Sequence, residues 1–536
     1  MSQTYTNLEH PPYTKGVIEL YEKGDKSEKL LNYITEREQT KNALREFFEN
    51  LGTTYFLVED PYIDKDFLED YSNYYARSYR NHGRFCERIH FFSKSEAFEL
   101  NTEKFQKIVV SIDKEEISEL NRCYLGFVTL RPSSLTKRIG KTCLKNYKND
   151  SSRNRQYTAV REYKVNLYGI PLEVNSMAFQ EQDEAVAVCA SIALWSAFQI
   201  TGKHNQHEIP SPSIVTKLAL SESSYVKEYP SIGLTSEQIA VAVNKVGITP
   251  TIRVMRNTRE LKQYIYAYLK AKIPIVCGIS LFDVRSDLKT GEKSIASSKS
   301  FHAITINGFS FEDGEVEMAV GKKGLQLRSS RMTKFFAHDD QLCPFSRIDF
   351  NSKTNVKIGN LPCNLMHTTW KSDKKEVEEY KYAKIETIIV PLNHKVRVSY
   401  QEVLVKIRNY SIVLRNSIKV FFEKSDIKIK ISNRFEWEIY LTKVNDFKKE
   451  IRENSTIDEK IKLNILMYQN YPKYIWVARA YKKDNIKLEL IFDATESKIT
   501  YLKDYIIYDP IFRAIGVFDE VLEKSKKNFK QWIQKT

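Results

Sequence analysis

An apolar helix that begins at a cysteine, and a strand that begins at a histidine about a hundred residues later, constrain the fold of this 536-residue chain more than any other feature. Residues 186–198 are small or apolar throughout, which predicts a buried helix with Cys189 in its first turn. Residues 302–309 alternate between two faces, which predicts a strand that begins at His302. Helices first and paired strands second is the order of an α+β fold.

A cysteine at a helix start can be a nucleophile or a core residue. Unpaired backbone N–H groups and the helix dipole favour the thiolate, which is the reactive form. However, most cysteines that lie among Ala, Val, Ile and Leu are inert and buried. His302 favours the first interpretation, because a strand presents its ring from a rigid element, as a general base requires. Cys189 is therefore the candidate nucleophile and His302 its base.

Two further groups would complete such a site. A polar side chain must orient the imidazole and hold its cation. Residues 332–338 predict a strand that runs into Asp339 and Asp340, and we choose Asp339 with Asp340 as the alternative. The competing interpretation of this pair is an acidic turn. Gln180 and Gln182, just upstream of Cys189, are the candidate amide donors.

The order of these residues resembles that of papain-like cysteine peptidases: Gln, Cys at a helix start, His at a strand start, and Asp at the end of a following strand. Residues 302–309, with the sequence HAITINGF, are also similar to the His strand of the bacterial peptidases that cleave double-glycine leader peptides. The resemblance covers roughly residues 165 to 395. The chain departs from the family pattern in three ways: Cys189-Ala190 replaces the usual Cys-Gly, no Trp directly follows the cysteine, and Gln182 lies one residue further upstream than is common.

The resemblance implies a role for each residue. Cys189 would be the nucleophile, His302 the base and then the acid, and Asp339 the residue that orients His302. Gln182 and the backbone N–H of Cys189 would form the oxyanion hole, with Gln180 as the alternative donor. No metal and no organic cofactor is implied. His204 and His207, three residues apart, lack the Cys or carboxylate partners of a metal site apart from Glu208.

The polar run at residues 146–156 is rich in turn formers and has no periodicity, so it predicts an exposed loop or a boundary. A second boundary is expected near Ser399. The predicted domains are an α/β domain for recognition or regulation (1–150), a papain-like peptidase domain (157–397) and an α+β domain (398–536).

Local patterns predict the other elements. In the first domain they are helices at 26–50 and 64–79 and strands at 107–112 and 124–130. In the second they are a helix capped by Thr235 or Ser236, a helix at 260–270, strands at 273–280 and 316–320, and an exposed rim at 283–299. In the third they are a helix from Val403 and strands at 436–441, 474–479 and 488–492.

The net charge of +15 and the pI near 9.1 raise the question of a nucleic-acid partner. Lysines are spread along the whole chain, so we interpret the excess as a bias of composition. The competing interpretation is a phosphate-binding face in the basic stretch 134–164, built from Lys137, Arg138, Lys141 and Lys145.

Seven scattered cysteines without a CxxC pair predict neither a disulfide framework nor a structural zinc site, and they suit a reducing compartment. The first thirty residues lack the pattern of a signal peptide, and no apolar run reaches the ~20 residues that a bilayer requires. We therefore expect a cytoplasmic chain without membrane contact.

These patterns together predict a cytoplasmic cysteine peptidase that hydrolyses peptide bonds with a Cys-His-Asp triad. Its partners would be a protein or peptide substrate and a regulatory protein, because a protease in its own cytosol must be selective or switched. One alternative is an acyltransferase or amidase that uses the same Cys–His pair. Another is a non-catalytic papain-like scaffold that binds protein or nucleic acid.

Overall fold

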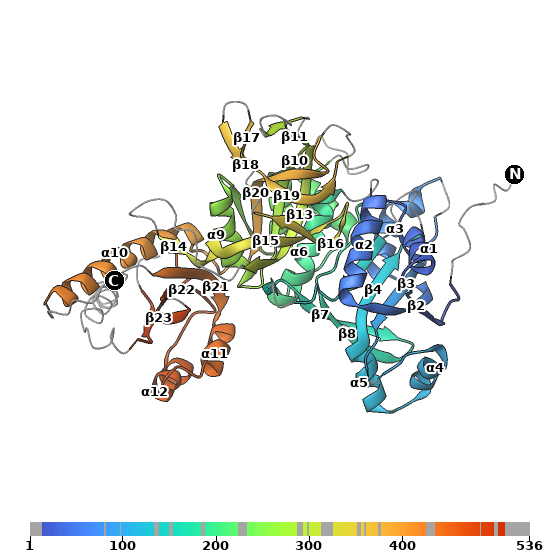
Figure 1. Ribbon diagram of the computed structural model, residues 1–536, viewed down its shortest axis with the longest axis horizontal. Helices are drawn as coiled ribbons and strands as arrows, with labels where there is room; N and C mark the ends of the chain where they lie inside the picture. Colours follow the sequence, from blue (N-terminus) through green and yellow to red (C-terminus); the bar gives the residue numbers. More distant parts are fainter. Residues whose placement is uncertain are drawn as a thin grey trace. The chain divides into compact units, whose positions relative to one another are not determined.

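The computed structural model in Figure 1 contains helices and several β-sheets, so the predicted α+β class is confirmed. The chain forms two compact units. The larger unit comprises 1–255, 273–311 and 333–391, and the smaller unit comprises 256–272, 312–332 and 392–536. The residues that the structure describes are 13–79, 82–96, 98–132, 139–149, 154–183, 188–222, 233–286, 293–296, 300–311, 325–350, 355–358, 361–372, 377–424, 435–482, 484–497 and 502–509.

The N-terminal part of the larger unit is a five-stranded sheet in which all neighbouring strands are antiparallel and follow chain order. Tyr55 and Leu57 pack with two helices on one face, and Phe56 and Val58 pack with two others on the opposite face, as strand alternation requires. The strands are β1 (Ile18–Leu20), β2 (Thr53–Tyr62), β3 (Cys86–Ser93), β4 (Tyr124–Leu130) and β5 (Ile139–Leu144), and the helices are α4 (Thr102–Val110) and α5 (Lys114–Cys123) on the first face and α1 (Asp25–Ile34) and α2 (Glu38–Leu51) on the second.

Several predictions for this part need correction. The strand expected at 107–112 is wrong, because residues up to Val110 belong to α4, which Asn101 caps and which buries Phe105 and Ile108. The helix expected at 26–50 is two helices, and that at 64–79 is α3 (Lys65–Asn73) followed by a 3-10 turn, η1 (Tyr75–Arg77). The strand expected at 124–130 is confirmed as β4.

Residues 146–156 are expected to form an exposed loop or a boundary. The described residues of this stretch are instead partly buried and partly in a strand. Tyr147 is buried in the core under α1 and α2. Residues from Asn154 form β6 (Asn154–Tyr157), which pairs with the strand that carries His302. Residues 150–153 lie outside the described residues. The turn-forming composition thus marks a connection inside the larger unit, where the neighbouring residues pack and pair.

A buried helix stands between the N-terminal sheet and a second sheet. This helix, α6 (Cys189–Asn205), is buried on all sides from Ala190 to Gly202. A hairpin of β7 (Arg161–Leu167) and β8 (Ile170–Ser176) shares its apolar core. The helices α7 (Pro212–Leu220) and α8 (Ser236–Lys245) join the same core, and Thr235 forms the predicted N-terminal cap of α8, with Gln238 completing a capping box.

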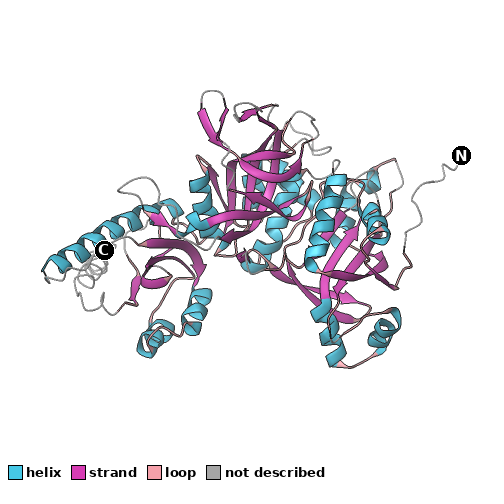
Figure 2. Cartoon of the chain, in the orientation of Figure 1, coloured by secondary structure: helices cyan, strands magenta, loops and turns pink. Residues whose placement is uncertain are grey.

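The second sheet of the larger unit closes on itself, because β10 pairs with both β13 and β20. The strands follow the order β10, β13, β15, β16, β19, β20 and back to β10, with β6 and β9 added outside the ring. Figure 2 shows these strands beside the helices of the same unit. Their bounds are β9 (Thr249–Val254), β10 (Ile275–Phe282), β13 (Ser300–Phe311), β15 (Met332–Asp339), β16 (Cys343–Asp349), β19 (Met366–Lys371) and β20 (Tyr380–Leu392).

The expected strands at 273–280, 302–309 and 332–338 are confirmed as β10, β13 and β15. The strand expected at 316–320 lies outside the described residues. The rim expected at 283–299 contains a short hairpin, β11 (Val284–Ser286) with β12 (Lys293–Ile295), where it is described. A second short hairpin pairs β17 (Asn355–Ile358) with β18 (Leu361–Asn364).

The smaller unit is a five-stranded sheet with helices, and it contains the expected elements of the third domain together with α9 (Thr258–Leu269). The tyrosine Tyr266 on α9 donates a hydrogen bond to Glu438 of this sheet. Its other elements are β14 (Gln326–Leu327), η2 (Arg328–Arg331), α10 (Tyr400–Lys424), β21 (Glu436–Lys443), α11 (Val444–Glu453), α12 (Glu459–Leu463), the π-helical turn η3 (Asn464–Tyr468), β22 (Tyr474–Lys482), β23 (Asn485–Asp493) and β24 (Asp504–Ile507).

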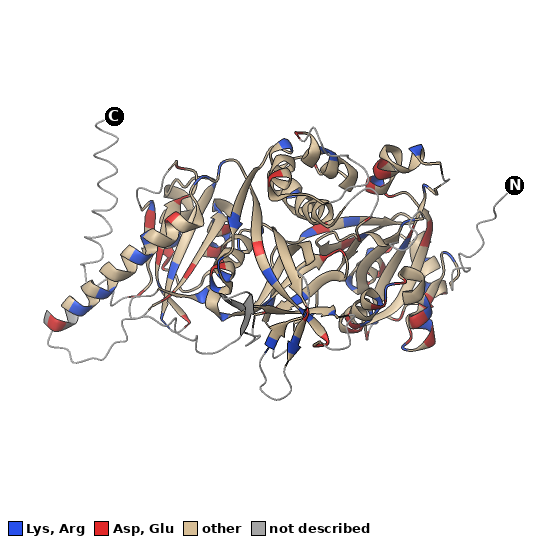
Figure 3. Cartoon of the chain, turned by 90° about the horizontal axis from the view of Figure 1, so that it is seen from above, with Lys and Arg blue, Asp and Glu red and all other residues tan. Residues whose placement is uncertain are grey.

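Of the four residues of the candidate phosphate-binding face, the two that the structure describes make contacts within the chain. Lys141 pairs with the buried Asp66 at 3.1 Å, and Lys145 donates to the carbonyl of Arg122 at 3.1 Å. Lys137 and Arg138 lie outside the described residues. Figure 3 shows basic and acidic residues mixed along the helices and strands. In the part of the chain that the structure describes, no helix is long and apolar enough to cross a bilayer.

Candidate active site

Cys189 is the first residue of α6, as the sequence predicts. The residue before it, Val188, has an extended backbone and provides no side-chain cap, so the first N–H groups of the helix have no capping side chain there. Cys189 is half-buried, whereas the five other cysteines whose side chains the structure describes are buried. Among the described cysteines, Cys189 is therefore the one that a reagent can reach, and it lies at a helix N-terminus.

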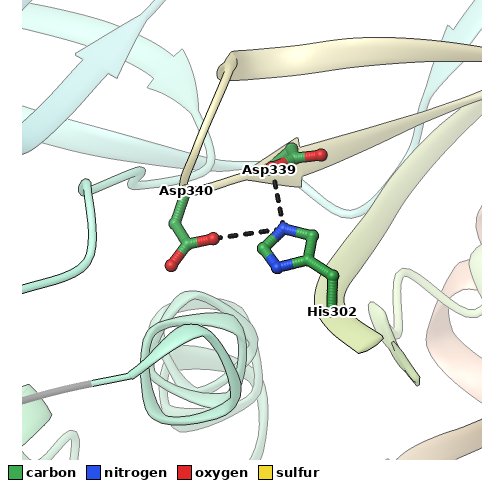
Figure 4. A group of neighbouring side chains, drawn as sticks. All are labelled: His302, Asp339 and Asp340. Carbon is green, nitrogen blue, oxygen red and sulfur yellow. Dashed lines mark hydrogen bonds and ion pairs between the residues drawn. The ribbon is translucent and has the colours of Figure 1, made fainter. Parts of the chain in front are cut away.

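His302 lies near the start of β13, which packs against α6 and bonds to it through Thr305 Oγ1 and the carbonyl of Ala193 at 2.5 Å. Its Nε2 donates to Asp339 Oδ1 at 2.9 Å, and Asp340 Oδ1 is 3.3 Å from the same nitrogen. Figure 4 shows both carboxylates on one side of the ring. The structure thus brings together His302 and both of the predicted acidic residues.

The second nitrogen of His302, Nδ1, is the atom left for Cys189. It is buried and makes no hydrogen bond with a described residue. The Cys189 side chain is among the groups that raise the pKa of His302. Because Nε2 is occupied by the carboxylates, Nδ1 is the nitrogen that remains for this thiol.

The charges of the pair stabilise each other. Burial alone would lower the pKa of His302, but the charge and the hydrogen bond of Asp339, with Cys189 and Asp340, raise it well above 6.5. Burial alone would raise the pKa of Asp339, but His302, Trp370 and the N–H of Gln341 lower it. The pair is therefore a buried imidazolium and carboxylate near neutral pH.

Trp370, on β19, is a further residue of the site that the sequence did not reveal. Its Nε1 donates to Asp339 Oδ2 at 2.8 Å, and its ring meets the His302 ring edge-on with centroids 5.6 Å apart. The N–H of Gln341 donates to Asp339 Oδ1 at 3.1 Å. Asp339 is thus fixed by three donors, which holds it in position to orient His302.

A register shift in the pairing of β15 with β16, between Ala337 and Asp339, accounts for the two neighbouring carboxylates. Consecutive residues of a regular strand point to opposite faces. β15 ends at Asp339, and a turn begins at Asp340, so both side chains reach His302. Asp339, the first choice from the sequence, is the nearer of the two.

His338, the residue before Asp339, has a structural role. Its Nε2 donates to the carbonyl of Met177 at 2.9 Å, and its Nδ1 accepts from the N–H of Phe345 at 3.2 Å. Burial lowers its pKa to about 4, so the ring is neutral near pH 7. Both nitrogens are engaged in holding the chain together, so His338 is unsuited to the role of base.

Gln180 and Gln182 lie in the segment that leads from Met177 towards α6. Gln180 is buried, and Gln182 is half-buried. An oxyanion donor must reach the substrate, so the more accessible Gln182 suits this role better. Its assignment as oxyanion donor stays a prediction.

One group of described residues could also hold a metal ion: His302, Asp339 and Asp340 offer ligand atoms within 4.8 Å of one another. Imidazole and carboxylate are ligands that Zn²⁺ accepts. A metal here would have to replace the proton that His302 shares with Asp339.

The second candidate metal residue from the sequence, His207, uses both of its ring nitrogens within the chain, with Thr201 Oγ1 and the carbonyl of Glu208.

No protein-family model matches the chain, and no curated protein matches it at a significant level. The assignment to papain-like peptidases therefore stays a prediction, and the geometry of the described residues carries the functional argument.

Proposed function

We propose that this chain is a cysteine peptidase in which Cys189, His302 and Asp339 form the catalytic triad. The observation that carries the proposal is the buried His302–Asp339 ion pair, together with a half-buried thiol at the start of α6 that is among the groups raising the pKa of His302. A thiol, a base and a group that orients the base are the three parts of nucleophilic acyl transfer.

In the proposed reaction, the Cys189 thiolate attacks the carbonyl carbon of a peptide bond, and the electron pair moves to the oxygen. The backbone N–H of Cys189 and the amide of Gln182 would stabilise this oxyanion. The imidazolium of His302 then protonates the leaving amine as the C–N bond breaks. In the second half, His302 takes a proton from water, which attacks the thioester and releases the acid and the thiol.

A purely structural role accounts poorly for this arrangement. Removing two charges from water is expensive, and replacing a buried ion pair with apolar residues is often neutral or stabilising. A non-catalytic scaffold would therefore gain little from His302 and Asp339. A histidine with a strongly raised pKa, a carboxylate with a lowered pKa and a half-buried thiol are typical of active sites.

Peptidase activity predicts new protein N-termini in cells. We expect cells that express the wild-type chain to contain a set of cleaved N-termini that is absent from cells with Cys189→Ala at equal expression. Quantitative mass spectrometry of protein N-termini measures this difference. Identical sets would contradict the peptidase, and modified substrates without new N-termini would indicate the acyltransferase or amidase instead.

A further inference from the structure

The segment that carries the candidate oxyanion donors is attached to the N-terminal sheet. We call residues 177–183 the glutamine segment. Phe179 and Thr142 of β5 exchange two backbone hydrogen bonds, of 2.8 and 2.9 Å, in an antiparallel bridge. Two residues further on, the N–H of Glu181 donates to the carbonyl of Ile139 at 3.1 Å. The glutamine segment therefore continues the five-stranded sheet at the edge of β5.

Arg131, which directly follows β4, holds the far end of this segment. Its guanidinium donates to the carbonyl of Glu181 at 3.2 Å and lies 4.0 Å from the carboxylate of Asp183. Tyr75 donates a hydrogen bond to the same carboxylate. Arg131 is 2% exposed, so these contacts form away from solvent. The residues on both sides of Gln182 are thus fixed by Arg131.

The local structure makes room for Arg131. A Cβ atom on Gly140 of β5 would lie 3.0 Å from Arg131 Cγ, closer than nearly all real contacts. Neighbouring residues of a paired segment face opposite sides. Since Glu181 contacts β5 and Asp183 contacts Arg131, the side chain of Gln182 between them faces the opposite side from theirs.

Arg131 does more to fix the geometry of the glutamine segment than to stabilise the fold. Burying a guanidinium is expensive, and burial lowers the pKa of Arg131 while the charges of Glu181, Asp70 and Asp64 oppose the change. The triad makes no use of Arg131. Its contacts instead hold the backbone carbonyl of Glu181 and the side chain of Asp183, on either side of Gln182. An error of about 1 Å in the position of a catalytic group can cost about 100-fold in rate.

We propose that Arg131 is a positioning residue of the active site, which holds the glutamine segment so that Gln182 meets the oxyanion formed at Cys189. This inference rests on the proposed function. It makes the N-terminal sheet a part of the catalytic apparatus, because β4 and β5 position a group that acts on the substrate.

Two chemical probes of Cys189 separate this role from that of the triad. p-Nitrophenyl acetate acylates a thiolate through a tetrahedral oxyanion, whereas iodoacetamide alkylates it by displacement at a saturated carbon, without an oxyanion. For Arg131→Met we expect acylation of Cys189 to slow by about 100-fold, the loss typical of one oxyanion donor. Alkylation should stay within about twofold, because the thiol and His302 are unchanged.

A double variant tests whether Arg131 acts through Gln182. Gln182→Ala alone should slow acylation to a similar extent. Adding Arg131→Met to Gln182→Ala should slow it by no more than about twofold further, because residues that act as a unit are not additive. Multiplied losses in the double variant would overturn the proposal.

Arg88→Met is the matched control, since Arg88 is also a buried arginine of the N-terminal sheet. It donates to Glu59 at 2.7 Å and to the carbonyl of Asn166 at 2.8 Å, away from the glutamine segment. Both probe rates should be unchanged in this variant. If Arg131→Met fails to fold, Asp183→Asn is used instead, because it removes the charge next to Arg131 and keeps an acceptor for Tyr75; acylation should slow by about tenfold.

The outcomes distinguish this inference from the proposed function. Equal losses of acylation and alkylation in Arg131→Met, or the same loss of acylation in Arg88→Met, would overturn the role of Arg131 and leave the triad standing. A wild-type Cys189 that reacts with neither probe faster than a free thiol would instead remove the proposed function, and this inference with it.

Discussion

Replacing Cys189 with alanine is expected to abolish turnover, with a loss of about 10⁴-fold or more, because no other group can form the thioester. The fold should survive, since the side chain is half-buried and its loss costs about 1 kcal/mol. The rate is measured on a peptide that spans a cleavage site identified from cellular N-termini, and the fold is checked by circular dichroism. Cys189→Ser should be nearly as inactive, because a serine hydroxyl is far harder to ionise.

Two buried cysteines provide the controls for this prediction. Burial raises the pKa of the Cys343 thiol to about 12, and it also holds the pKa of Cys277 above its usual range. Both thiols are therefore protonated and inert near neutral pH. Cys277→Ala and Cys343→Ala should keep wild-type activity per folded molecule. If one of them abolishes turnover while Cys189→Ala retains it, the nucleophile has been wrongly chosen.

Replacing Asp339 with asparagine is expected to lower kcat by about 10³- to 10⁴-fold. The change removes the anion that most raises the pKa of His302, while the burial that lowers it remains. His302 would then be neutral at pH 7, and the amide can favour the wrong tautomer of the ring. The measurement is kcat on the same peptide, together with the ¹⁵N chemical shifts of His302, which report its protonation.

Asp340→Asn is the matched control, because Asp340 is equally buried and lies 3.3 Å from the same nitrogen. Its loss should lower kcat by about tenfold only, since Asp339 already accepts the hydrogen bond. A larger loss in Asp340→Asn than in Asp339→Asn would assign the orienting role to Asp340. If the wild-type activity requires Zn²⁺ and both variants lose this zinc-dependent activity, a metal site at these residues is favoured instead.

The parts of the site that follow from local patterns were predictable from the sequence. The start of α6 at Cys189 follows from the run of small and apolar residues, and the end of β15 at Asp339 follows from a strand pattern that meets two acidic residues. The strand predicted at 107–112 failed for the same kind of reason. Its short run of β-branched residues is compatible with either element, and the cap at Asn101 with the spacing of Phe105 and Ile108 decides for a helix.

Contacts between residues that are distant in the sequence could not be predicted. Trp370 reaches Asp339 because the closed sheet brings β19 next to the end of β15, which no local pattern of Trp370 indicates. Arg131 contacts Glu181 across 50 residues of sequence. The smaller unit likewise combines α9 with strands more than a hundred residues later, so a division of the chain by linker composition could not find it.

The central claim is that the imidazolium of His302 stabilises a thiolate at Cys189, and the rate of iodoacetamide alkylation at this residue tests it most directly. The raised pKa of His302 keeps its cation as the pH rises through 6.5, so the positive charge that the proposal places beside the thiol is present both below and above that pH. Site-resolved mass spectrometry should show rapid alkylation of wild-type Cys189 already at about pH 5.5, and His302→Ala should remove it there. Slow alkylation that rises only above about pH 8, equal in wild type and His302→Ala, would contradict the claim.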